Sequence, residues 1–410
     1  MWVYRVGLLF MARFHPKAKE FLKGRQEQRL AWEKIFSHHA HRIIWLHCAS
    51  LGEFEQGRPI IEACRRAYPR HKLLLTFFSP SGYQLRKNYE HADWVLYLPL
   101  DSPQQAEQLV RWVRPELALF VKYEFWYYYL SELHKQQIPT ILFAAIFRPS
   151  QLFFKPYGNF FRKMLHFFSE IHVQDESSRQ LLANIGVTHV TVSGDTRIDR
   201  VAQIADAAAS VDAVADFVAE EPVIVMGSIW QKDWEVVSRD VQILHKHYKF
   251  IVVPHEINER FLQTIEQTLG TQNCIRYSAI SPELTHKLGA YRALLIDKIG
   301  LLSSLYLYAQ IAYIGGGFKE GLHNILEPAA FGVPVVFGNR KYHPFREAKE
   351  LLAQGGARTI AKSGQFADIV SYWLNNRAAL QNASAICKDY VQYNRGATQQ
   401  IMESISRYLR

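Results

Sequence analysis

One stretch in the C-terminal half decides the fold class: Ile311-Ala-Tyr-Ile-Gly-Gly-Gly317-Phe-Lys-Glu-Gly321-Leu-His-Asn324-Ile-Leu-Glu327-Pro-Ala-Ala-Phe-Gly332-Val-Pro-Val-Val-Phe337. A short apolar run ends in three glycines, a helix follows, Gly332 ends that helix, and a second apolar run begins. This order predicts a βαβ unit with a phosphate-sized site at the end of its first strand. Glycines let a backbone approach a ligand closely, and the following helix offers unpaired N–H groups to an anion.

The length and composition of the chain limit the class of protein that it can form. With 410 residues, two domains are the natural division. No uninterrupted apolar run of about 18 residues occurs, so we expect no membrane-spanning helix. Residues 1–14 are apolar but short and carry two arginines, which fits either an interfacial membrane anchor or an ordinary buried first helix. The four cysteines show no paired spacing, so we expect free thiols and a cytoplasmic location.

The formal net charge is +10, which is typical of proteins that bind nucleic acid, anionic lipid or a phosphorylated substrate. The positive charges are scattered along the chain, and no helix has the pattern of a recognition helix. We therefore expect an anionic membrane surface or an anionic substrate, and no nucleic acid.

Continuous apolar runs alternate with helical patterns in both halves, which predicts parallel sheets covered on both faces. The fold class is α/β, with two doubly wound domains facing each other across a cleft. We place the first domain at 1–203 and the second at 204–410, with last helices that could pack back on the first. The expected strands are 43–47, 72–78, 94–98, 117–121, 140–143, 171–174 and 190–194, then 223–226, 250–254, 294–296, 311–314 and 335–337.

Two acids follow strands of the first half, and each has two interpretations. Glu53 lies at a helix start, where it is either a cap matched to the helix dipole or a catalytic base. Glu124 follows the strand 117–121 and is either a surface acid beside Lys122 or a catalytic group. Two carboxylates at the carboxyl edge of one parallel sheet can act as base and orienter for a hydroxyl nucleophile.

Further polar loops leave similar alternatives open. Arg197 could hold a phosphate or form a salt bridge with Asp195 or Asp199. Asn324 and Glu327 have the spacing of a capping box, yet Glu327 could also bind ribose hydroxyls beside a helix start that faces phosphate. No Asp-x-Asp pair occurs in the chain, so nothing in the sequence requires a metal ion.

Three motifs together resemble a known family. His47-Cys-Ala-Ser-Leu-Gly-Glu-Phe54 resembles the His-Ala-Ser-x-Gly-Glu signature of the 3-deoxy-D-manno-octulosonic acid (Kdo) transferases. Glu124-Phe-Trp126 is similar to the family's Glu-Leu-Trp, and Gly315–Gly317 with His323–Ala330 is similar to its Gly-Gly-Ser and His-Asn-Pro-Leu-Glu-Ala-Ala runs. The order and spacing agree from about residue 43 to residue 357.

The resemblance implies a GT-B fold whose first domain binds a lipid acceptor and whose second binds CMP-Kdo. It implies an inverting, metal-independent transfer of Kdo to the 6′-hydroxyl of a lipid A precursor, lipid IVA. Glu53 would be the general base, and Glu124 and Arg197 would stabilise the transition state. The implied donor contacts are Pro254, His255, Ile299, Gly300, Leu301, Asn324, Ile325, Leu326 and Glu327.

The chain departs from the family at several of these positions. The usual Pro-Arg-His reads Pro254-His255-Glu256, so an arginine contact to the nucleotide is missing. The usual Met-Gly-Glu reads Ile299-Gly300-Leu301, which leaves backbone contacts there, and Arg197 replaces a lysine.

The resemblance also places the protein at the cytoplasmic face of the bacterial inner membrane, peripheral or monotopic. Residues 1–14 and the aromatic, basic region 153–168 suit an anionic lipid surface, although the second could equally be an amphipathic helix packed in its own domain. Two alternatives remain: another GT-B enzyme acting on a soluble nucleotide sugar, such as an epimerase, and a non-catalytic lipid-binding protein.

Overall fold

The structure is a computed structural model that describes residues 14, 16–36 and 39–409. The expected membrane-associating segment over residues 1–14 lies outside the described residues except for Phe14. The chain forms two compact units, Met1–Asp199 together with Arg395–Arg410, and Arg200–Asn394. The units divide between Asp199 and Arg200, within helix α9 (Thr196–Asp206), which also contains the division that we expected at 203/204.

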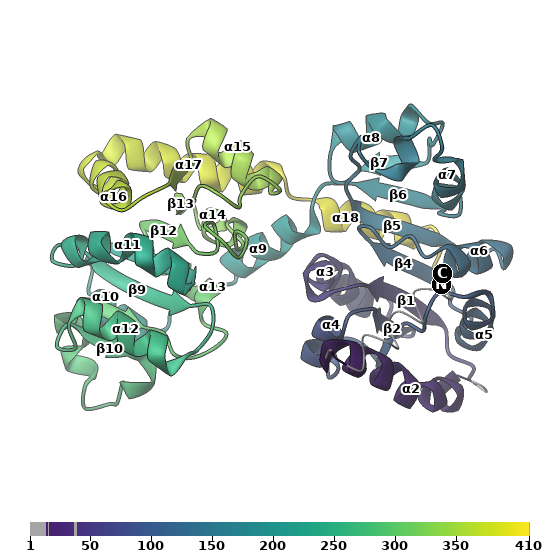
Figure 1. Cartoon of the computed structure of the whole chain (residues 1–410), viewed down its shortest axis with the longest axis horizontal. Helices are drawn as coiled ribbons and strands as arrows, with labels where there is room; N and C mark the ends of the chain where they lie inside the picture. The colour runs from purple at the N-terminus through teal and green to yellow at the C-terminus, as the bar shows by residue number, and fades with distance from the viewer. Residues whose placement is uncertain (1–13, 15, 37–38, 410) are drawn as a thin grey trace. The chain divides into compact units, whose positions relative to one another are not determined.

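The first unit contains one parallel sheet in the order β3-β2-β1-β4-β5-β6-β7 (Figure 1). Its strands are β1 (Ile43–Cys48), β2 (Lys72–Phe77), β3 (Trp94–Tyr97), β4 (Leu117–Val121), β5 (Thr140–Ala145), β6 (Glu170–Val173) and β7 (Val190–Val192). Its helices are α2 (Pro16–Phe36), α3 (Leu51–Ala67), α4 (Pro80–Arg86), α5 (Pro103–Val113), α6 (Tyr127–Lys135), 3-10 turn η1 (Leu152–Phe154), α7 (Asn159–Leu165), α8 (Glu176–Ala183) and α18 (Ala397–Ser406).

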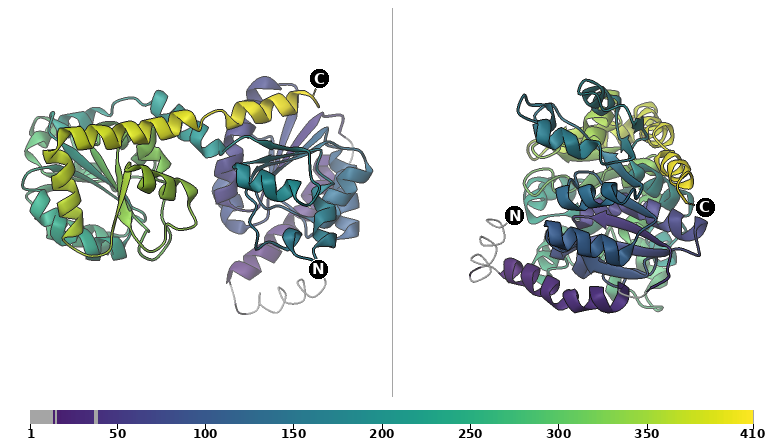
Figure 2. Two further views of the ribbon diagram at one scale, coloured as in Figure 1. Left: turned by 90° about the horizontal axis from the view of Figure 1, so that it is seen from above. Right: turned by 90° about the vertical axis from the view of Figure 1, so that its right-hand side faces the viewer.

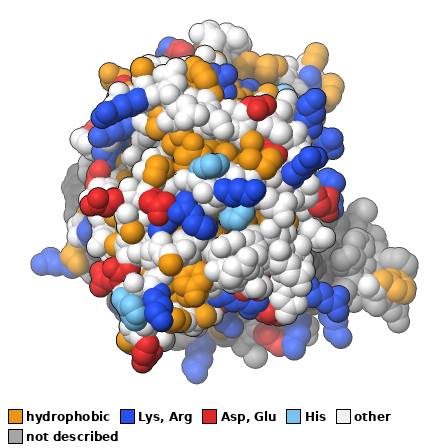
Figure 3. All heavy atoms as spheres, turned by 90° about the vertical axis from the view of Figure 1, so that its left-hand side faces the viewer, with side chains coloured by type: hydrophobic (Ala, Val, Ile, Leu, Met, Phe, Trp, Pro, Cys, Tyr) orange, Lys and Arg blue, Asp and Glu red, His pale blue; other side chains and the backbone are white. Residues whose placement is uncertain are grey.

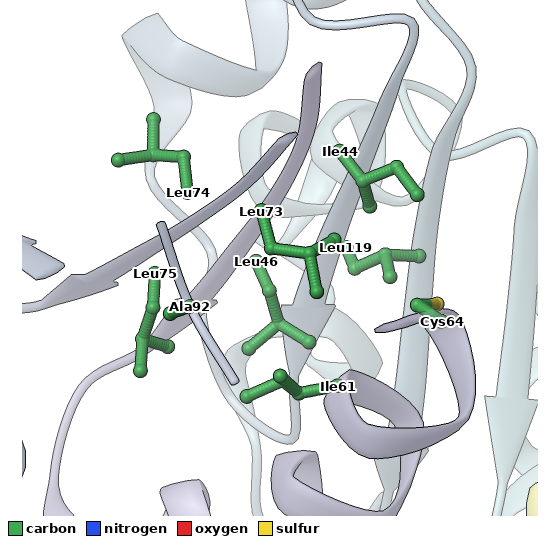
Figure 4. A pocket seen from close by; sticks show the side chains of 9 residues that line it. All are labelled: Ile44, Leu46, Ile61, Cys64, Leu73, Leu74, Leu75, Ala92 and Leu119. Atoms are coloured by element: carbon green, nitrogen blue, oxygen red, sulfur yellow. The ribbon is translucent and has the colours of Figure 1, made fainter. Parts of the chain in front are cut away.

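Alternation along β1 explains the two layers that cover this sheet. Trp45 faces the layer formed by α2, α5 and α6, where Val110 and Leu130 are fully buried. Leu46 faces the opposite layer, which α3 and α18 supply. A void of about 10 Å³ beside β1 and α3 is lined by apolar side chains alone, so it is a packing gap rather than a polar site (Figure 4).

Helix α18 belongs to the first unit, whereas α16 (Gln365–Asn375) and α17 (Arg377–Tyr393) belong to the second. It packs on α3, and Figure 2 shows it beside the first sheet. Asp199 secures the start of α18, because its two carboxylate oxygens accept the backbone N–H groups of Gly396 and Thr398, both at 2.6 Å.

The second unit also contains one parallel sheet, in the order β10-β11-β9-β8-β12-β13-β14. Its strands are β8 (Val223–Ile229), β9 (Lys249–Pro254), β10 (Cys274–Arg276), β11 (Ala293–Leu295), β12 (Ile311–Ile314), β13 (Val335–Gly338) and β14 (Ala357–Ile360). Its helices are α10 (Asp212–Val218), α11 (Gln231–Leu244), α12 (Glu259–Leu269), η2 (Tyr277–Ala279), η3 (Thr285–Ala290), α13 (Leu302–Leu305), η4 (Tyr306–Tyr308), α14 (Leu326–Ala330), α15 (Arg346–Gln354), α16 (Gln365–Asn375) and α17 (Arg377–Tyr393).

The structure corrects the expected stretch after β12 in two ways. The helix begins at Leu326 and has five residues, so Phe318–Ile325 is a loop and no long helix presents its N-terminus there. The glycines are needed by the chain itself. A Cβ at Gly315 would lie 2.1 Å from the carbonyl oxygen of Ser228, and one at Gly317 would lie 2.6 Å from that of Gly338.

Both sheets have a point where strand order reverses, between β1 and β4 in the first unit and between β8 and β12 in the second. Loops at such a point form the usual ligand crevice of an open parallel sheet. Glu53 and Glu124 follow β1 and β4, and the Gly315–Gly317 turn follows β12. In each unit, the candidate residues therefore follow the carboxyl ends of the strands at the point where strand order reverses.

No helix among the described residues is both long and apolar enough to cross a membrane. Positive charges are dispersed on the face shown in Figure 3, where lysine, arginine, acidic and hydrophobic side chains are interspersed. This agrees with the scattering of basic residues along the sequence.

Candidate active site

Glu53 is the third residue of α3, and Ser50 is the N-cap of that helix. Oε2 of Glu53 accepts both the backbone N–H of Ser50 at 2.8 Å and its hydroxyl at 2.9 Å. The expected capping role is therefore real. It does not exclude catalysis, because both bonds end on Oε2 and the side chain remains only partly buried.

Burial raises the pKa of Glu53 above the usual value of a glutamate, and the negative charge of Glu124 raises it further. The hydrogen bonds from Ser50 and the positive charge of Lys122 act in the opposite direction. A carboxylate fixed at a helix start, partly accessible and with a raised pKa has the properties of a general base.

Glu124 is not the surface acid that one interpretation predicts, since its exposed fraction is 5%. Its Oε2 lies 3.0 Å from Nε2 of His47 and accepts the indole N–H of Trp126 at 2.6 Å. His47 is fully buried at the end of β1. A buried acid needs such partners, so Glu124 is held by the neighbouring strand and by its own loop.

Arg197 forms the salt bridge that the sequence left open, with Asp195 as its partner at 2.6 Å. Asp199, the other candidate partner, instead holds the start of α18. Thr196 donates its hydroxyl to the carbonyl oxygen of Gln56 on α3 at 2.6 Å, which brings the start of α9 to the helix that carries Glu53. The structure thus gathers all three predicted catalytic residues around α3 and the β4–α6 loop.

Cys48, the one cysteine near this site, is fully buried, and burial raises the pKa of its thiol well above the ordinary value. Burial therefore favours the protonated thiol, which is the less nucleophilic form.

Four of the predicted donor-binding residues line one cavity of about 460 Å³ in the second unit: Pro254, His255, Ile299 and Gly300. Ile299 is 86% exposed, so an apolar side chain projects at the rim of this cavity. Lys298 also lines it and supplies a cation that sequence reasoning missed. Leu301 is absent from the lining, although its neighbour Leu302 is present.

Asn324 and Glu327, two further predicted donor contacts, are not in the lining of this cavity, but Glu327 bonds to Ser303, which follows the lining residue Leu302. Glu327 accepts hydrogen bonds from Ser303 at 2.9 Å and from the side-chain amide of Asn324 at 3.1 Å. Asn324 also accepts the backbone N–H of Leu326. This geometry differs from a capping box at Asn324, because the N-cap of α14 is Ile325. Ile325 and Leu326 are buried, which leaves only their backbone for a ligand.

Three aromatic rings stack next to the same cavity and were missed at the sequence level. The ring centroids of Trp230 and His255, and those of His255 and His323, are both 4.3 Å apart. The indole N–H of Trp230 donates to Nε2 of His323 at 2.8 Å. Burial lowers the pKa of His255 and lowers that of His323 to about 4, so both rings are neutral at pH 7.

No group of three or more His, Cys, Asp or Glu side chains is arranged to hold a metal ion within the described part of the chain. The absence of a metal from the reaction remains a prediction that this finding does not test.

Comparison with known proteins supports the resemblance that the motifs indicate. The family described as 3-Deoxy-D-manno-octulosonic-acid transferase (kdotransferase) matches residues 24–200. A 3-deoxy-D-manno-octulosonic acid transferase of Aquifex aeolicus is 27% identical over 321 residues, covering 77% of this chain and 80% of the relative. One from Rickettsia bellii is 24% identical over 406 residues, covering 94% of both chains. The expected resemblance is confirmed, and so is the expectation of a glycosyltransferase enzyme.

A solved structure shows the same fold. UDP-GlcNAc 2-epimerase from Neisseria meningitidis, bound to UDP-GlcNAc, matches with a TM-score of 0.62 at 16% identity, covering 89% of this chain and all of the other. At this identity the likeness concerns the fold alone. Together with the two doubly wound sheets, it confirms the GT-B class.

Proposed function

We propose that the protein transfers Kdo from CMP-Kdo to the 6′-hydroxyl of a lipid A precursor, lipid IVA, in lipopolysaccharide biosynthesis, because residues 24–200 match the Kdo transferase family. The observation that carries the proposal is Glu53, a partly buried carboxylate whose pKa is raised by burial and by Glu124. The first unit would bind the acceptor and the second the donor.

In the proposed reaction, Glu53 takes the proton of the acceptor hydroxyl as that oxygen attacks the anomeric carbon of Kdo. The bond between this carbon and the phosphate oxygen breaks, CMP leaves with the electron pair, and the configuration inverts. Glu124 keeps a negative charge near the base and thereby makes it a better proton acceptor. Arg197 would stabilise negative charge that develops on the leaving phosphate.

For the donor, we infer that the cavity beside Pro254, His255, Ile299 and Gly300 receives the nucleotide. Lys298 offers the positive charge that the missing arginine would supply elsewhere in the family. Glu327, oriented by Asn324 and Ser303, is placed to accept hydrogen bonds from ribose hydroxyls. Contacts from Leu301, Ile325 and Leu326 would use backbone groups.

For the membrane, we propose that the aromatic, basic region 153–168 contacts an anionic lipid surface at the cytoplasmic face. Phe153 and Phe168 are buried, and Arg162 donates to the carbonyl oxygens of Phe153 and Lys155, so these residues build the region rather than face lipid. Phe160 and its neighbour Tyr157 are 51% and 71% exposed, which supports contact with lipid.

The test is an assay with purified protein, CMP-Kdo and lipid IVA, with the product identified by its mass. The wild type should add Kdo, and Glu53→Gln should lower kcat by about a thousandfold with unchanged thermal unfolding. Glu55→Gln is the matched control, since Glu55 lies on the same helix but pairs with Arg86 at 3.0 Å. No transfer by the wild type would refute the proposal.

The same preparation distinguishes the alternatives. Conversion of a soluble nucleotide sugar without lipid would favour an epimerase. Binding to anionic vesicles without any turnover would favour a lipid-binding protein.

A further inference from the structure

His47 belongs to a chain of buried polar groups that ends on Glu124. Trp45 Nε1 lies 2.9 Å from Thr76 Oγ1, Thr76 Oγ1 lies 2.8 Å from His47 Nδ1, and His47 Nε2 lies 3.0 Å from Glu124 Oε2. Trp45, His47 and Thr76 are fully buried. These hydrogen bonds link Trp45 and His47 on β1 through Thr76 on β2, and then link His47 to the loop after β4.

The indole N–H of Trp45 decides which groups donate and which accept in this series of hydrogen bonds. An indole nitrogen can only donate, so Thr76 Oγ1 accepts from Trp45. The hydroxyl proton of Thr76 then has two acceptors within reach, His47 Nδ1 at 2.8 Å and the carbonyl oxygen of Leu46 at 3.5 Å. The shorter contact is the better hydrogen bond, so Nδ1 of the neutral ring accepts and Nε2 carries the proton.

The other neutral tautomer would aim a lone pair of Nε2 at the carboxylate of Glu124 from 3.0 Å, which is repulsive. In a protonated ring, Nδ1 would donate to the carbonyl oxygen of Thr76 at 3.1 Å and Nε2 would still donate to Glu124. Trp126 Nε1 also lies 3.2 Å from His47 Nε2, but its contact with Glu124 Oε2 at 2.6 Å is shorter and takes the indole N–H. In both acceptable states of the ring, Nε2 therefore donates. Glu124 Oε2 thus receives two N–H groups, from His47 and from Trp126.

We propose that His47 is a positioning residue whose Nε2–H fixes the side chain of Glu124 in the β4–α6 loop, where Glu124 acts on Glu53. The inference rests on the proposed function for its role in catalysis, but its electrostatic part concerns the free protein. The groups around Glu53 are Glu124 and Lys122 from the β4–α6 loop and Ser50 from the start of α3. Cys48 at the end of β1 and Tyr123 also sense its charge.

Two substitutions at His47 separate positioning from packing. His47→Gln places an amide N–H where Nε2 stands and retains the donor. His47→Leu fills the space of the ring but removes the donor. His172→Gln is the control, because His172 is also fully buried in a strand of the same sheet but lies beside Glu170 instead of Glu124.

The first readout is the titration of Glu53, followed by its side-chain carboxyl carbon in NMR spectra and assigned with Glu53→Gln. With His47→Leu the midpoint should move to lower pH, because a displaced Glu124 no longer repels the ionised base. With His47→Gln and His172→Gln it should stay at the wild-type position. An unchanged midpoint with His47→Leu, or an equal shift with His172→Gln, would overturn the inference.

The second readout is kinetic. His47→Leu should lower kcat by about tenfold or more while the KM for CMP-Kdo stays within about twofold, and His47→Gln should recover most of the rate. Equal losses for His47→Leu and His47→Gln would mean a packing role only. If the wild type transfers no Kdo, the proposed function fails, yet the titration still decides whether His47 acts on Glu53 through Glu124.

Discussion

The guanidinium of Arg197 lies against Asp195 and donates to one carboxylate oxygen, Oδ2, through Nε at 2.9 Å and through Nη2 at 2.6 Å. The backbone N–H of Arg197 donates to the other oxygen, Oδ1, at 2.9 Å. Asp195 therefore fixes both the backbone and the side chain of Arg197 at the start of α9. A cation oriented in this way suits a role at a reacting phosphate, although the same salt bridge could serve stability alone.

Substitutions at this pair distinguish the two roles. If Arg197 stabilises the transition state, Arg197→Met should lower kcat by about a hundredfold, and Arg197→Lys should lose less because it keeps the charge. Asp195→Asn should produce an intermediate loss through misorientation. The measurement is steady-state transfer, normalised to folded protein. A purely structural pair would instead lower the unfolding temperature in all three variants and leave kcat of the folded fraction unchanged.

The raised pKa of Glu53 predicts the acid side of the pH profile. Glu53 must be ionised to accept a proton, so kcat/KM should fall at a pH above the usual value of a glutamate. Glu124→Gln removes a negative charge that raises this pKa, and the fall should move to lower pH. Lys122→Gln removes a positive charge that lowers it, and the fall should move to higher pH. Shifts of the same sign in both variants would contradict this electrostatic account.

Close backbone approach at Gly315 makes a prediction about stability. A Cβ there would meet the carbonyl oxygen of Ser228 at 2.1 Å, and backbone atoms cannot move aside as a flexible side chain can. Gly315→Ala should lower the free energy of unfolding by about 3 kcal/mol. Gly289→Ala is the control in the same unit, since its Cβ would meet its nearest atom at 3.5 Å, and it should change stability by less than about 1 kcal/mol. Denaturant unfolding compares the two.

Much of the fold follows from sequence because the inner strands are continuous apolar runs. The predicted strand 117–121 coincides with β4, and α5 begins at Pro103 with Ser102 as its N-cap. The missed strands β10 and β14 have three and four residues, and β14 carries the polar pair Arg358-Thr359.

The site was less accessible to sequence reasoning because its decisive contacts join distant residues. Glu124 and His47 are 77 positions apart, so nothing local distinguishes a buried acid from an exposed one beside Lys122. His47 begins the motif that resembles the family's signature, but it contacts Phe120 on the face of the sheet opposite the layer that contains α3 and Glu53. Only pairing of β1 with β4 brings it under the loop of Glu124.

The stacked histidines of the second unit give a pH dependence of stability. The pKa of His323 is lowered to about 4 in the folded protein, whereas an unfolded histidine titrates near 6.5. Between these two pH values the unfolded chain binds a proton that the folded chain does not bind. The free energy of unfolding must therefore fall as the pH decreases through this window. Replacement by glutamine removes the titration, and the difference in unfolding midpoint between wild type and His323→Gln should therefore shrink from pH 7 to pH 5. A difference that stays constant over this range would show that His323 accepts its proton as readily in the folded state, and that the stack with His255 and Trp230 does not exclude the charge.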